Sequence, residues 1–346
     1  MLLTDPFDTT ETGFLTAPLS SIDSTEHADI TEFMHSGPDP RILNLSYSGR
    51  LDLHSCPRRY QLNKLGATSD ATESETDTIT FSYGHCVGLG MQLVLEGASM
   101  DVILWRLAQE WKADLWAENK KQNKSFASAI YAVQKFIRLR SAGYLGGFSL
   151  VTYKGKPACE LSFIIHLPNG YKYRGYVDAV LQNAETGEIM VLECKTSSAA
   201  VIHQATYRNS AQAIGYSIVL DALFPELSSY KVLYLVYSTK EYEYEALVFN
   251  KSYVMRARWI RELILECETL SLYIEHDIFP MHGESCMDYF RECKYLGLCE
   301  MTTERLTKPL TAEIVRKIEA EHEDFEFSVS VEDLITTQLT KTGDTE

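Results

Sequence analysis

The sequence from Tyr171 to Ser197 reads YKYRGYVDAVLQNAETGEIMVLECKTS, and the interpretation of the whole chain begins from it. Tyr171–Leu181 is rich in Tyr and Val, Ile189–Cys194 is a second apolar run, and the turn-forming stretch Asn183–Gly187 separates them. Two apolar runs joined by a short polar turn predict a β-hairpin. The ionisable residues of this hairpin indicate which chemistry it can support.

Asp178 lies on the first predicted strand, and Glu193 and Lys195 lie on the second. Side chains alternate between the faces of a strand, so Glu193 and Lys195 share one face and Cys194 points to the other. A hairpin can bring Asp178 alongside Glu193. Two adjacent carboxylates repel each other unless a cation lies between them, and Mg²⁺ is a hard ion that suits oxygen ligands. Lys195 is then placed to hold a water or to stabilise a developing negative charge.

The pattern Asp, spacer, Glu-x-Lys resembles the PD-(D/E)XK nuclease superfamily. The resemblance implies an α/β core with a central mixed sheet, flanking helices, and Mg²⁺- or Mn²⁺-dependent hydrolysis of DNA phosphodiester bonds. It also implies that Asp178, Glu193 and the backbone carbonyl of Cys194 hold the metal ion while Lys195 positions the attacking water. The alternative is a solvated surface hairpin, because the same pattern also arises by chance.

Two further motifs resemble the RecB-like and Cas4-like branch of this superfamily. The first is Cys-Pro-x-x-Tyr beginning at Cys56, shortly after a Ser-x-Ser. The second is Gln-x-x-x-Tyr at Gln212 and Tyr216, on a predicted helix over Ile202–Leu220. Residues four apart share a helix face, so this pair would act together. The resemblance implies that the pair contacts the substrate backbone or orients Lys195.

Three of the eight cysteines, Cys286, Cys293 and Cys299, lie close together in the sequence. Clustered cysteines in a reducing compartment indicate a soft metal, and three thiolates need a fourth ligand, for which Cys56 is the natural candidate. One cysteine before the core and three after it resemble the AddB-type and Cas4-type iron–sulfur exonucleases. This implies a [4Fe–4S] cluster that staples the C-terminal segment. A zinc site or unligated thiols are the alternatives, because the first gap of six residues is wider than the usual two.

Four other side chains are weaker candidates. RecB-like nucleases often carry a metal-site histidine at the position that is Gly88 here, and the nearest histidine, His85, would be a displaced metal ligand or a structural histidine near the start of a helix. Glu160, one predicted strand before Asp178, would be an accessory metal ligand or an edge-strand glutamate. Arg58 and Arg59 would contact DNA phosphates or solvate a helix face.

The net charge of −16 is unusual for a DNA-binding protein, but its distribution is uneven. Residues 1–40 contain eight acidic residues and no Lys or Arg, and residues 301–346 contain eleven acidic and five basic residues. Residues 41–300 contain 29 acidic and 27 basic residues, so the body of the chain is nearly neutral. The acidic ends would be solvating segments or partner-docking arms.

We therefore expect an acidic, disordered N-terminal tail over residues 1–42 and a nuclease domain over residues 43–300. A helical insertion would occupy about 98–146 and pack on the core. Residues 301–346 would be an acidic C-terminal tail outside the catalytic unit, with one helix near Ala312–His322. No apolar run reaches the length of a membrane span, and no secretory signal is evident, so we expect a soluble cytoplasmic protein, in the host cytoplasm if phage-encoded.

In the order expected for the family, these motifs predict a metal-dependent DNA nuclease, an exonuclease of recombination, repair or replication. The predicted partners are DNA and a helicase or a recombination or replication protein. One alternative is a catalytically weak or inactive nuclease-fold protein that binds DNA or scaffolds a complex, which the missing histidine and low basicity favour. The other is a metal-stapled interaction protein whose acidic ends do the work.

Overall fold

The computed structural model describes residues 38–67, 79–119, 122–199, 201–227, 230–288, 291–301, 309–323 and 325–343. Most of the predicted N-terminal tail lies outside these ranges. Its last residues do not, and there Ile42 is already buried at 5% exposure. In the described part of the chain, no helix is both long enough and apolar enough to cross a membrane.

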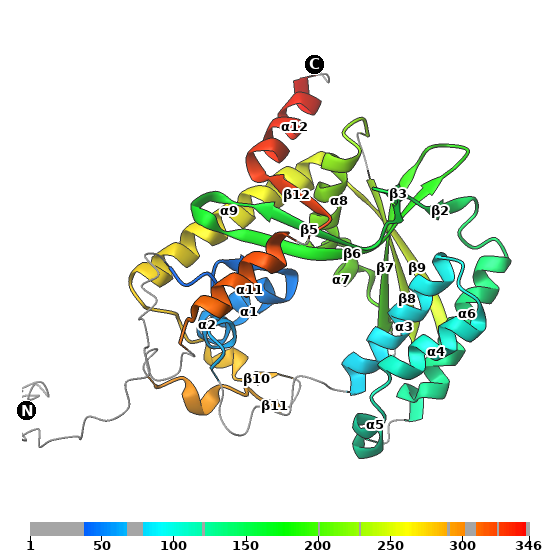
Figure 1. Cartoon of the computed structure of the whole chain (residues 1–346), viewed down its shortest axis with the longest axis horizontal. Helices are drawn as coiled ribbons and strands as arrows, with labels where there is room; N and C mark the ends of the chain where they lie inside the picture. Colours follow the sequence, from blue (N-terminus) through cyan, green and yellow to red (C-terminus); the bar gives the residue numbers. More distant parts are fainter. Residues whose placement is uncertain are drawn as a thin grey trace, which may run out of the picture. The chain divides into compact units, whose positions relative to one another are not determined.

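A mixed β-sheet forms the centre of the domain (Figure 1). Within the described ranges its eight strands are β1 (Asn44–Leu45), β2 (Phe148–Leu150), β5 (Cys159–His166), β6 (Lys172–Asn183), β7 (Ile189–Ser197), β8 (Tyr230–Ser238), β9 (Glu243–Lys251) and β12 (Phe327–Ser330). Six follow the order β12-β5-β6-β7-β8-β9, while β1 and β2 both pair with β6. The β7–β8 and β12–β5 pairs are parallel, and β5–β6, β6–β7 and β8–β9 are antiparallel.

The predicted hairpin is confirmed as β6 and β7, paired from Ala179 with Leu192 to Gln182 with Ile189. Its turn follows from side-chain chemistry. The Asn183 Oδ1 accepts hydrogen bonds from the backbone N–H groups of Glu185 at 2.9 Å and Thr186 at 3.1 Å. Gly187 then adopts a φ of 72°, which glycine reaches without the steric cost of a Cβ.

Helices α3 (Ile79–Leu95), α4 (Met100–Glu110) and α6 (Phe126–Ser141) cover one face of the sheet (Figure 1). Their apolar residues pack against sheet residues such as Leu192 and Leu235. The predicted helical insertion therefore forms one of the layers of the core. Within this insertion the chain breaks at Trp111, whose extended ψ of 127° ends α4 before α5 (Ala113–Asn119) begins.

The opposite face is covered by α1 (Tyr47–Ser55), α8 (Ala211–Leu223), α9 (Tyr253–Glu275) and α12 (Val331–Gly343). Ser46 caps α1 by accepting a hydrogen bond from the Gly49 N–H, and Pro57 starts α2 (Pro57–Lys64) after a break at Cys56. Arg50 of α1 forms a buried ion pair with Glu266 of α9. This pair ties the N-terminal helix to the long helix near the C-terminal end of the domain.

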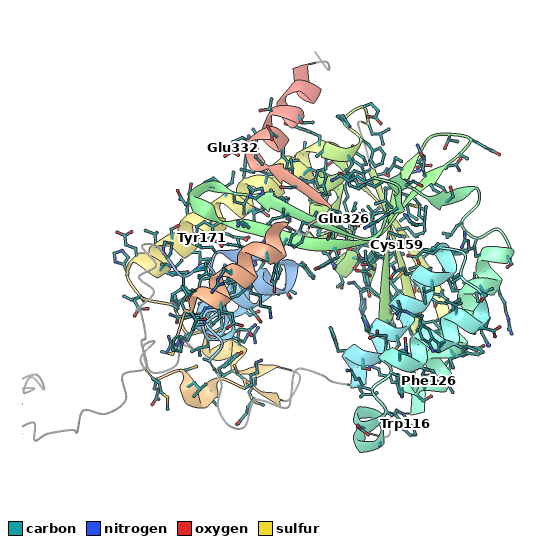
Figure 2. All side chains as sticks on the ribbon, in the orientation of Figure 1. Trp116, Phe126, Cys159, Tyr171, Glu326 and Glu332 are labelled. Atoms are coloured by element: carbon teal, nitrogen blue, oxygen red, sulfur yellow. The ribbon has the colours of Figure 1, made fainter. Side chains whose placement is uncertain are left out.

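The C-terminal segment also belongs to this unit, which differs from the expectation of an acidic tail. The expected helix is present as α11 (Ala312–Glu323). Beyond it, β12 runs parallel to β5, and the backbone N–H of Glu326, labelled in Figure 2, donates to the Ser162 Oγ at 3.1 Å. Val331 and Leu334 of α12 are buried in the core cluster that contains α8 and α9. The high acidic content concealed a strand of four residues, which is too short to show a reliable period.

Leu334 offers a test of this docking, because its side chain is 1% exposed. We expect Leu334→Ala to lower the free energy of unfolding by roughly 2–5 kcal/mol, the usual cost of truncating a buried leucine. Glu332→Ala, two residues away on the exposed side of α12, should change it by less than about 0.5 kcal/mol. Chemical denaturation measures both, and equal effects of the two variants would contradict the docked position of α12.

Candidate active site

Asp178 of β6 and Glu193 of β7 lie immediately beyond the last ladder pair of the hairpin, Ala179 with Leu192. At this point the Asp178 Oδ2 accepts a hydrogen bond from the backbone N–H of Cys194 at 2.8 Å. A side-chain carboxylate therefore replaces the strand carbonyl that would have continued the ladder. This bond fixes Asp178 beside Glu193, as the hairpin register predicted.

Glu193 is the most constrained group of the site, with 0% exposure. Neither of its carboxylate oxygens has a hydrogen-bond partner of normal geometry, although Oε1 forms an ion pair with the Lys195 Nζ. The Lys195 side chain is 38% exposed, so it reaches from Glu193 toward solvent. A buried carboxylate is costly unless it is paired, hydrogen-bonded or bound to a metal ion.

Electrostatics at the site reflect burial and carboxylate crowding. Burial, reinforced by the charge of Asp178, raises the pKa of Glu193 to about 8. Burial also raises the pKa of Asp178, against the opposing effects of the Cys194 N–H and Lys195. Burial alone would lower the pKa of Lys195, but the negative charge of Glu193 outweighs it and raises that pKa. The pair therefore retains a proton near neutral pH unless a cation compensates the second charge.

Glu160 of β5 lies across from Asp178, between the ladder pairs Cys159 with Ala179 and Leu161 with Val177. Its backbone has a φ of 48°, in the left-handed region, where a residue other than glycine costs roughly 1–3 kcal/mol. Partial desolvation, together with the charge of Asp178, raises its pKa to about 7. The structure therefore places a third carboxylate next to Asp178, as an accessory ligand would require.

Gln212 and Tyr216 lie one turn apart on α8, and the Gln212 Nε2 donates to the Tyr216 hydroxyl at 2.6 Å. Tyr216 is 4% exposed. Burial, followed by the charges of Glu193 and Asp178, raises its pKa well above the usual value. The predicted helix is broken near Asn209, between α7 (Gln204–Arg208) and α8. The structure thus brings Tyr216 to the carboxylates, while the functional role of the pair stays a prediction.

The side chain of His85 contacts Glu110 of α4 and not the carboxylates of the site. Its Nε2 lies 3.6 Å from the Glu110 Oε2 of α4, and its side chain is 55% exposed. What approaches β7 is the backbone of α3, because a Cβ added at Gly84 would lie 3.3 Å from the Thr196 Oγ1. A Cβ added at Gly88 would meet no heavy atom within 4 Å. The structure therefore provides no contact that would make His85 a metal ligand in its present position.

The two predicted DNA-contacting arginines are engaged within the protein. Arg58 is 8% exposed, and its Nη2 donates to the Met301 carbonyl at 2.6 Å. The Arg59 Nε lies 3.0 Å from the Asp52 Oδ1. Arg58 in particular joins α2 to the C-terminal side of the domain, so its position supports a structural role rather than a phosphate contact.

The four predicted cluster cysteines are gathered where the ends of the domain meet. The Arg58 N–H donates to the Pro280 carbonyl at 3.1 Å, which holds the start of α2 against the cysteine-rich segment. Burial raises the pKa of Cys299, and the nearby thiols of Cys293, Cys56 and Cys286 act in the same direction. All four are free thiols.

The donor atoms of the two predicted metal sites differ in their chemistry. Within the described ranges, no three His, Cys, Asp or Glu residues are spaced to hold a metal ion as they stand. The adjacent carboxylates of Asp178 and Glu193 nevertheless match the hard-oxygen chemistry of Mg²⁺ or Mn²⁺, and the Glu193 oxygens have no hydrogen bond of normal geometry to compete with a metal ion. Four neighbouring thiols match the soft-ligand chemistry of iron–sulfur clusters or zinc.

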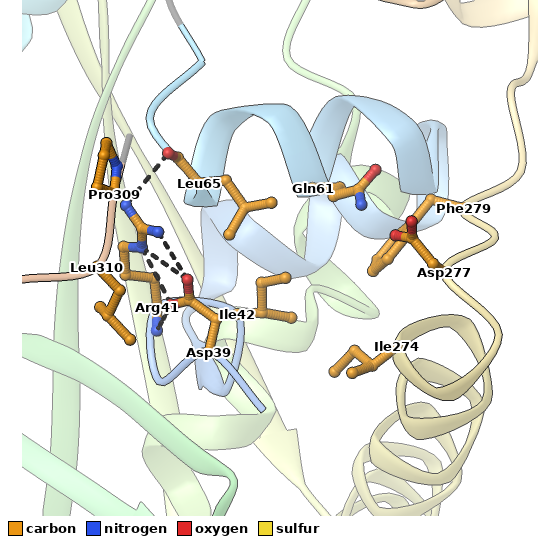
Figure 3. A pocket seen from close by; sticks show the side chains of 10 residues that line it. All are labelled: Asp39, Arg41, Ile42, Gln61, Leu65, Ile274, Asp277, Phe279, Pro309 and Leu310. Atoms are coloured by element: carbon orange, nitrogen blue, oxygen red, sulfur yellow. Dashed lines mark hydrogen bonds and ion pairs between the residues drawn. The ribbon is translucent and has the colours of Figure 1, made fainter. Parts of the chain in front are cut away.

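Two cavities lie away from the carboxylates. One, of about 270 Å³, is bounded by the segment before α1, by α2 and by the end of α9 (Figure 3). Arg41 forms part of its wall and is held by Asp39 and by the Leu65 carbonyl. The second, of about 300 Å³, includes Arg58 and Cys299. Neither is lined by Asp178, Glu193 or Lys195.

A family model of the PD-(D/E)XK nuclease superfamily matches residues 44–300. The chain belongs to this superfamily. Members of the PD-(D/E)XK superfamily are nucleases that use divalent metal ions. The match begins at β1 and ends just after Cys299, so it includes all the motifs on which the sequence interpretation rests.

Two solved structures resemble the chain only weakly. The first is a candidate exonuclease from Eubacterium rectale, with 13% identity, coverage of 87% of this chain and 99% of that one, and a TM-score of 0.45. The second is the protein SSO0001, with 15% identity, coverage of 74% and 98%, and a TM-score of 0.26. These likenesses add nothing to the assignment. No curated protein matches the chain.

Sequence analysis missed two tyrosines beside Lys195. Tyr234 of β8 is the register partner of Glu193, and the rings of Tyr207 and Tyr234 lie 5.0 Å apart. Parallel pairing between β7 and β8 brings these residues to the site. No local pattern marks them, because the pairing joins strands that are separated by two helices.

Glu193 gives the metal-free protein a pH-dependent stability. Its folded-state pKa is about 8 against an ordinary value of 4.5. A carboxyl whose pKa is raised by folding contributes stability that is complete below the unfolded-state pKa and is lost as the pH rises through the folded-state pKa. We therefore expect the melting temperature of chelator-treated protein to fall between about pH 4.5 and pH 8. Glu193→Gln, which cannot ionise, should show a smaller fall in thermal denaturation, and parallel profiles would contradict the assignment.

Proposed function

We propose that the protein is a Mg²⁺- or Mn²⁺-dependent deoxyribonuclease of the RecB-like and Cas4-like branch, acting as an exonuclease in recombination, repair or replication. The observation that carries the proposal is the Glu193 carboxylate, which is fully buried beside Asp178 and whose oxygens have no hydrogen bond of normal geometry besides the ion pair of Oε1 with Lys195. A protein gains little stability from such a group, so a bound cation is the best account of it. The family match supports the nuclease class.

In this proposal Asp178, Glu193 and the backbone carbonyl of Cys194 hold the metal ion, with Glu160 as an accessory ligand. The ion supplies Lewis-acid polarisation of the phosphate and a more acidic water. Lys195 extends from the buried Glu193 to the exposed side of the site, where its ammonium can hold the attacking water and offset negative charge. Gln212 and Tyr216 contact the substrate backbone or orient Lys195.

A [4Fe–4S] cluster on Cys56, Cys286, Cys293 and Cys299 is proposed as a structural staple. Its support is the gathering of the four thiols around Cys299, together with the contacts that hold the start of α2 against the cysteine-rich segment. Four thiolates complete the coordination of such a cluster and leave no open position for catalysis. DNA is the proposed substrate, and a helicase or a recombination or replication protein is the proposed partner.

A second candidate function is a nuclease-fold DNA-binding or scaffold protein with weak or no catalysis. One observation favours it: His85 is paired with Glu110 and Gly88 offers no side chain, so α3 contributes no histidine to the carboxylates. Cleavage of labelled DNA by the wild-type protein decides between the two candidates.

The first test of the proposed nuclease removes the three central side chains singly. Asp178→Ala, Glu193→Ala and Lys195→Ala should each reduce Mn²⁺-dependent cleavage of end-labelled DNA at least about 100-fold, because each removes a ligand or the water-holding charge. Lys231→Ala is the matched control. It breaks another Lys–Glu ion pair, between Lys231 of β8 and Glu188 just before the start of β7, far along the sheet from the site, and should cleave as the wild type does. Cleavage by Lys195→Ala at the wild-type rate would refute the assigned site.

The second test concerns the staple. After anaerobic purification we expect iron and sulfide in the protein and absorbance near ~400 nm from thiolate-to-iron charge transfer. Single Cys→Ser changes at the four proposed ligands should remove the cluster and lower the melting temperature. Cys267→Ser, at a thiol buried in the α9 core, should retain it. Stoichiometric zinc without iron would replace the cofactor but keep the staple, whereas protein free of both metals would refute it.

A further inference from the structure

Tyr234 lies beside the proposed metal site on the strand next to Glu193. In the parallel β7–β8 ladder, Glu193 is the register partner of Tyr234, so the two side chains lie on the same face of the sheet. Tyr234 is 1% exposed. The charge of Tyr234 affects the pKa of Lys195, and the charges of Glu193 and Lys195 affect the pKa of Tyr234. The three groups are therefore near neighbours.

The ring of Tyr234 is held on two sides. The Tyr207 ring lies 5.0 Å away at a steep angle, and the Phe249 ring lies 6.3 Å away, also edge to face. Such packing restricts the ring and therefore fixes where its hydroxyl lies. The hydroxyl itself is buried, and although the Ser210 side chain is close enough to lower its pKa, no hydrogen bond of normal geometry reaches it. A buried hydroxyl without a partner costs free energy, so its retention calls for an explanation.

Lys195 changes partner if the proposed metal site is correct. Without a cation its ammonium pairs with the Glu193 Oε1. Once the Glu193 oxygens serve as metal ligands, Lys195 loses its anionic partner and needs another acceptor near its new position. Tyr216, the other buried phenol close to Glu193, already accepts a hydrogen bond from Gln212.

We propose that Tyr234 is a positioning residue whose hydroxyl oxygen accepts a hydrogen bond from the Lys195 ammonium when Glu193 is engaged as a metal ligand. The inference rests on the proposed function, because it assumes that Glu193 binds the metal ion. This hydrogen bond would give the buried Tyr234 hydroxyl a partner of normal geometry. It would also fix the position from which the Lys195 ammonium holds water. A fixed acceptor on the neighbouring strand orients the flexible lysine without further ordering cost.

Tyr234→Phe removes the hydroxyl alone, and Tyr237→Phe is its matched control. Tyr237 is on the same strand, is 0% exposed, and also has a buried hydroxyl without a normal hydrogen bond. It belongs to the core on the opposite face of the sheet, under α3, α4 and α6. Loss of a buried, unpartnered hydroxyl should leave the metal-free stability of both variants close to that of the wild type.

The direct readout is trace labelling of Lys195 with an amine-reactive reagent, quantified by mass spectrometry without DNA. In metal-free protein the wild type and both variants should label equally, because Glu193 holds Lys195. With saturating Mn²⁺, Lys195 of Tyr234→Phe should label several-fold faster than that of the wild type, while Tyr237→Phe should match the wild type. Equal labelling of Tyr234→Phe and the wild type in Mn²⁺, or faster labelling of Tyr234→Phe already without metal, would overturn the inference.

Cleavage kinetics separate this inference from the proposed function. Tyr234→Phe should lower kcat roughly tenfold, the order expected for one hydrogen bond to a charged group, with unchanged KM for DNA and unchanged Mn²⁺ affinity. A wild-type protein that cleaves DNA while Tyr234→Phe keeps its full kcat would leave the nuclease proposal standing and remove the positioning role. If the wild-type protein does not cleave DNA but Lys195 still labels faster in Tyr234→Phe than in the wild type with Mn²⁺, the positioning role stands and the nuclease proposal falls.

Discussion

The arrangement of the site depends on the buried carboxylate of Glu193, to which the fold supplies no hydrogen bond of normal geometry. Glu193 lies at the centre of the sheet, on the face covered by α8 and α9, where water does not reach it. The strands on either side keep it there, because β7 pairs with β6 before this residue and with β8 along its full length. A shift of one residue in the register would only turn Glu193 to the other covered face, under α3, α4 and α6, and would displace Leu192 and its neighbours from that core. The sheet register therefore enforces the electrostatic cost of the site.

The groups around Glu193 reduce the free-energy cost of burying its carboxylate or occupy positions next to it. Lys195 supplies a positive charge from the same strand, Asp178 replaces a backbone acceptor at the end of the ladder, and Tyr216 presents a phenol from the helix above. These groups come from three elements that are separate in the sequence. The rigidity of the surrounding core holds them within reach of one another, which flexible loops would not do.

The parts of this arrangement that depend on local patterns were predictable from the sequence. Two apolar runs and the turn-forming stretch between them predicted the hairpin, and such a hairpin can bring Asp178 alongside Glu193. Helical spacing likewise placed Gln212 over Tyr216. Other parts depend on tertiary pairing. The left-handed φ of Glu160, the alignment of Tyr234 with Glu193 and the turning of His85 toward Glu110 have no local signature. Composition was misleading for the C-terminal segment, because acidic residues such as Glu313 and Glu332 are exposed on helices whose apolar residues, such as Val315 and Leu334, are buried.

The position of β12 has a consequence for how the protein is made. During synthesis β5, β6 and β7 leave the ribosome long before Phe327–Ser330, so β5 is for that time an unpaired edge of the growing sheet. An apolar edge strand with free N–H and C=O groups is a template for pairing with another chain. The parallel partner β12 is made much later than β5 and is followed at once by α12, whose buried residues pack it against α8 and α9. A chain that lacks β12 thus carries an aggregation-prone edge that β12 otherwise covers, and the loss of Phe327–Ser330 would be far more harmful than the removal of four residues suggests.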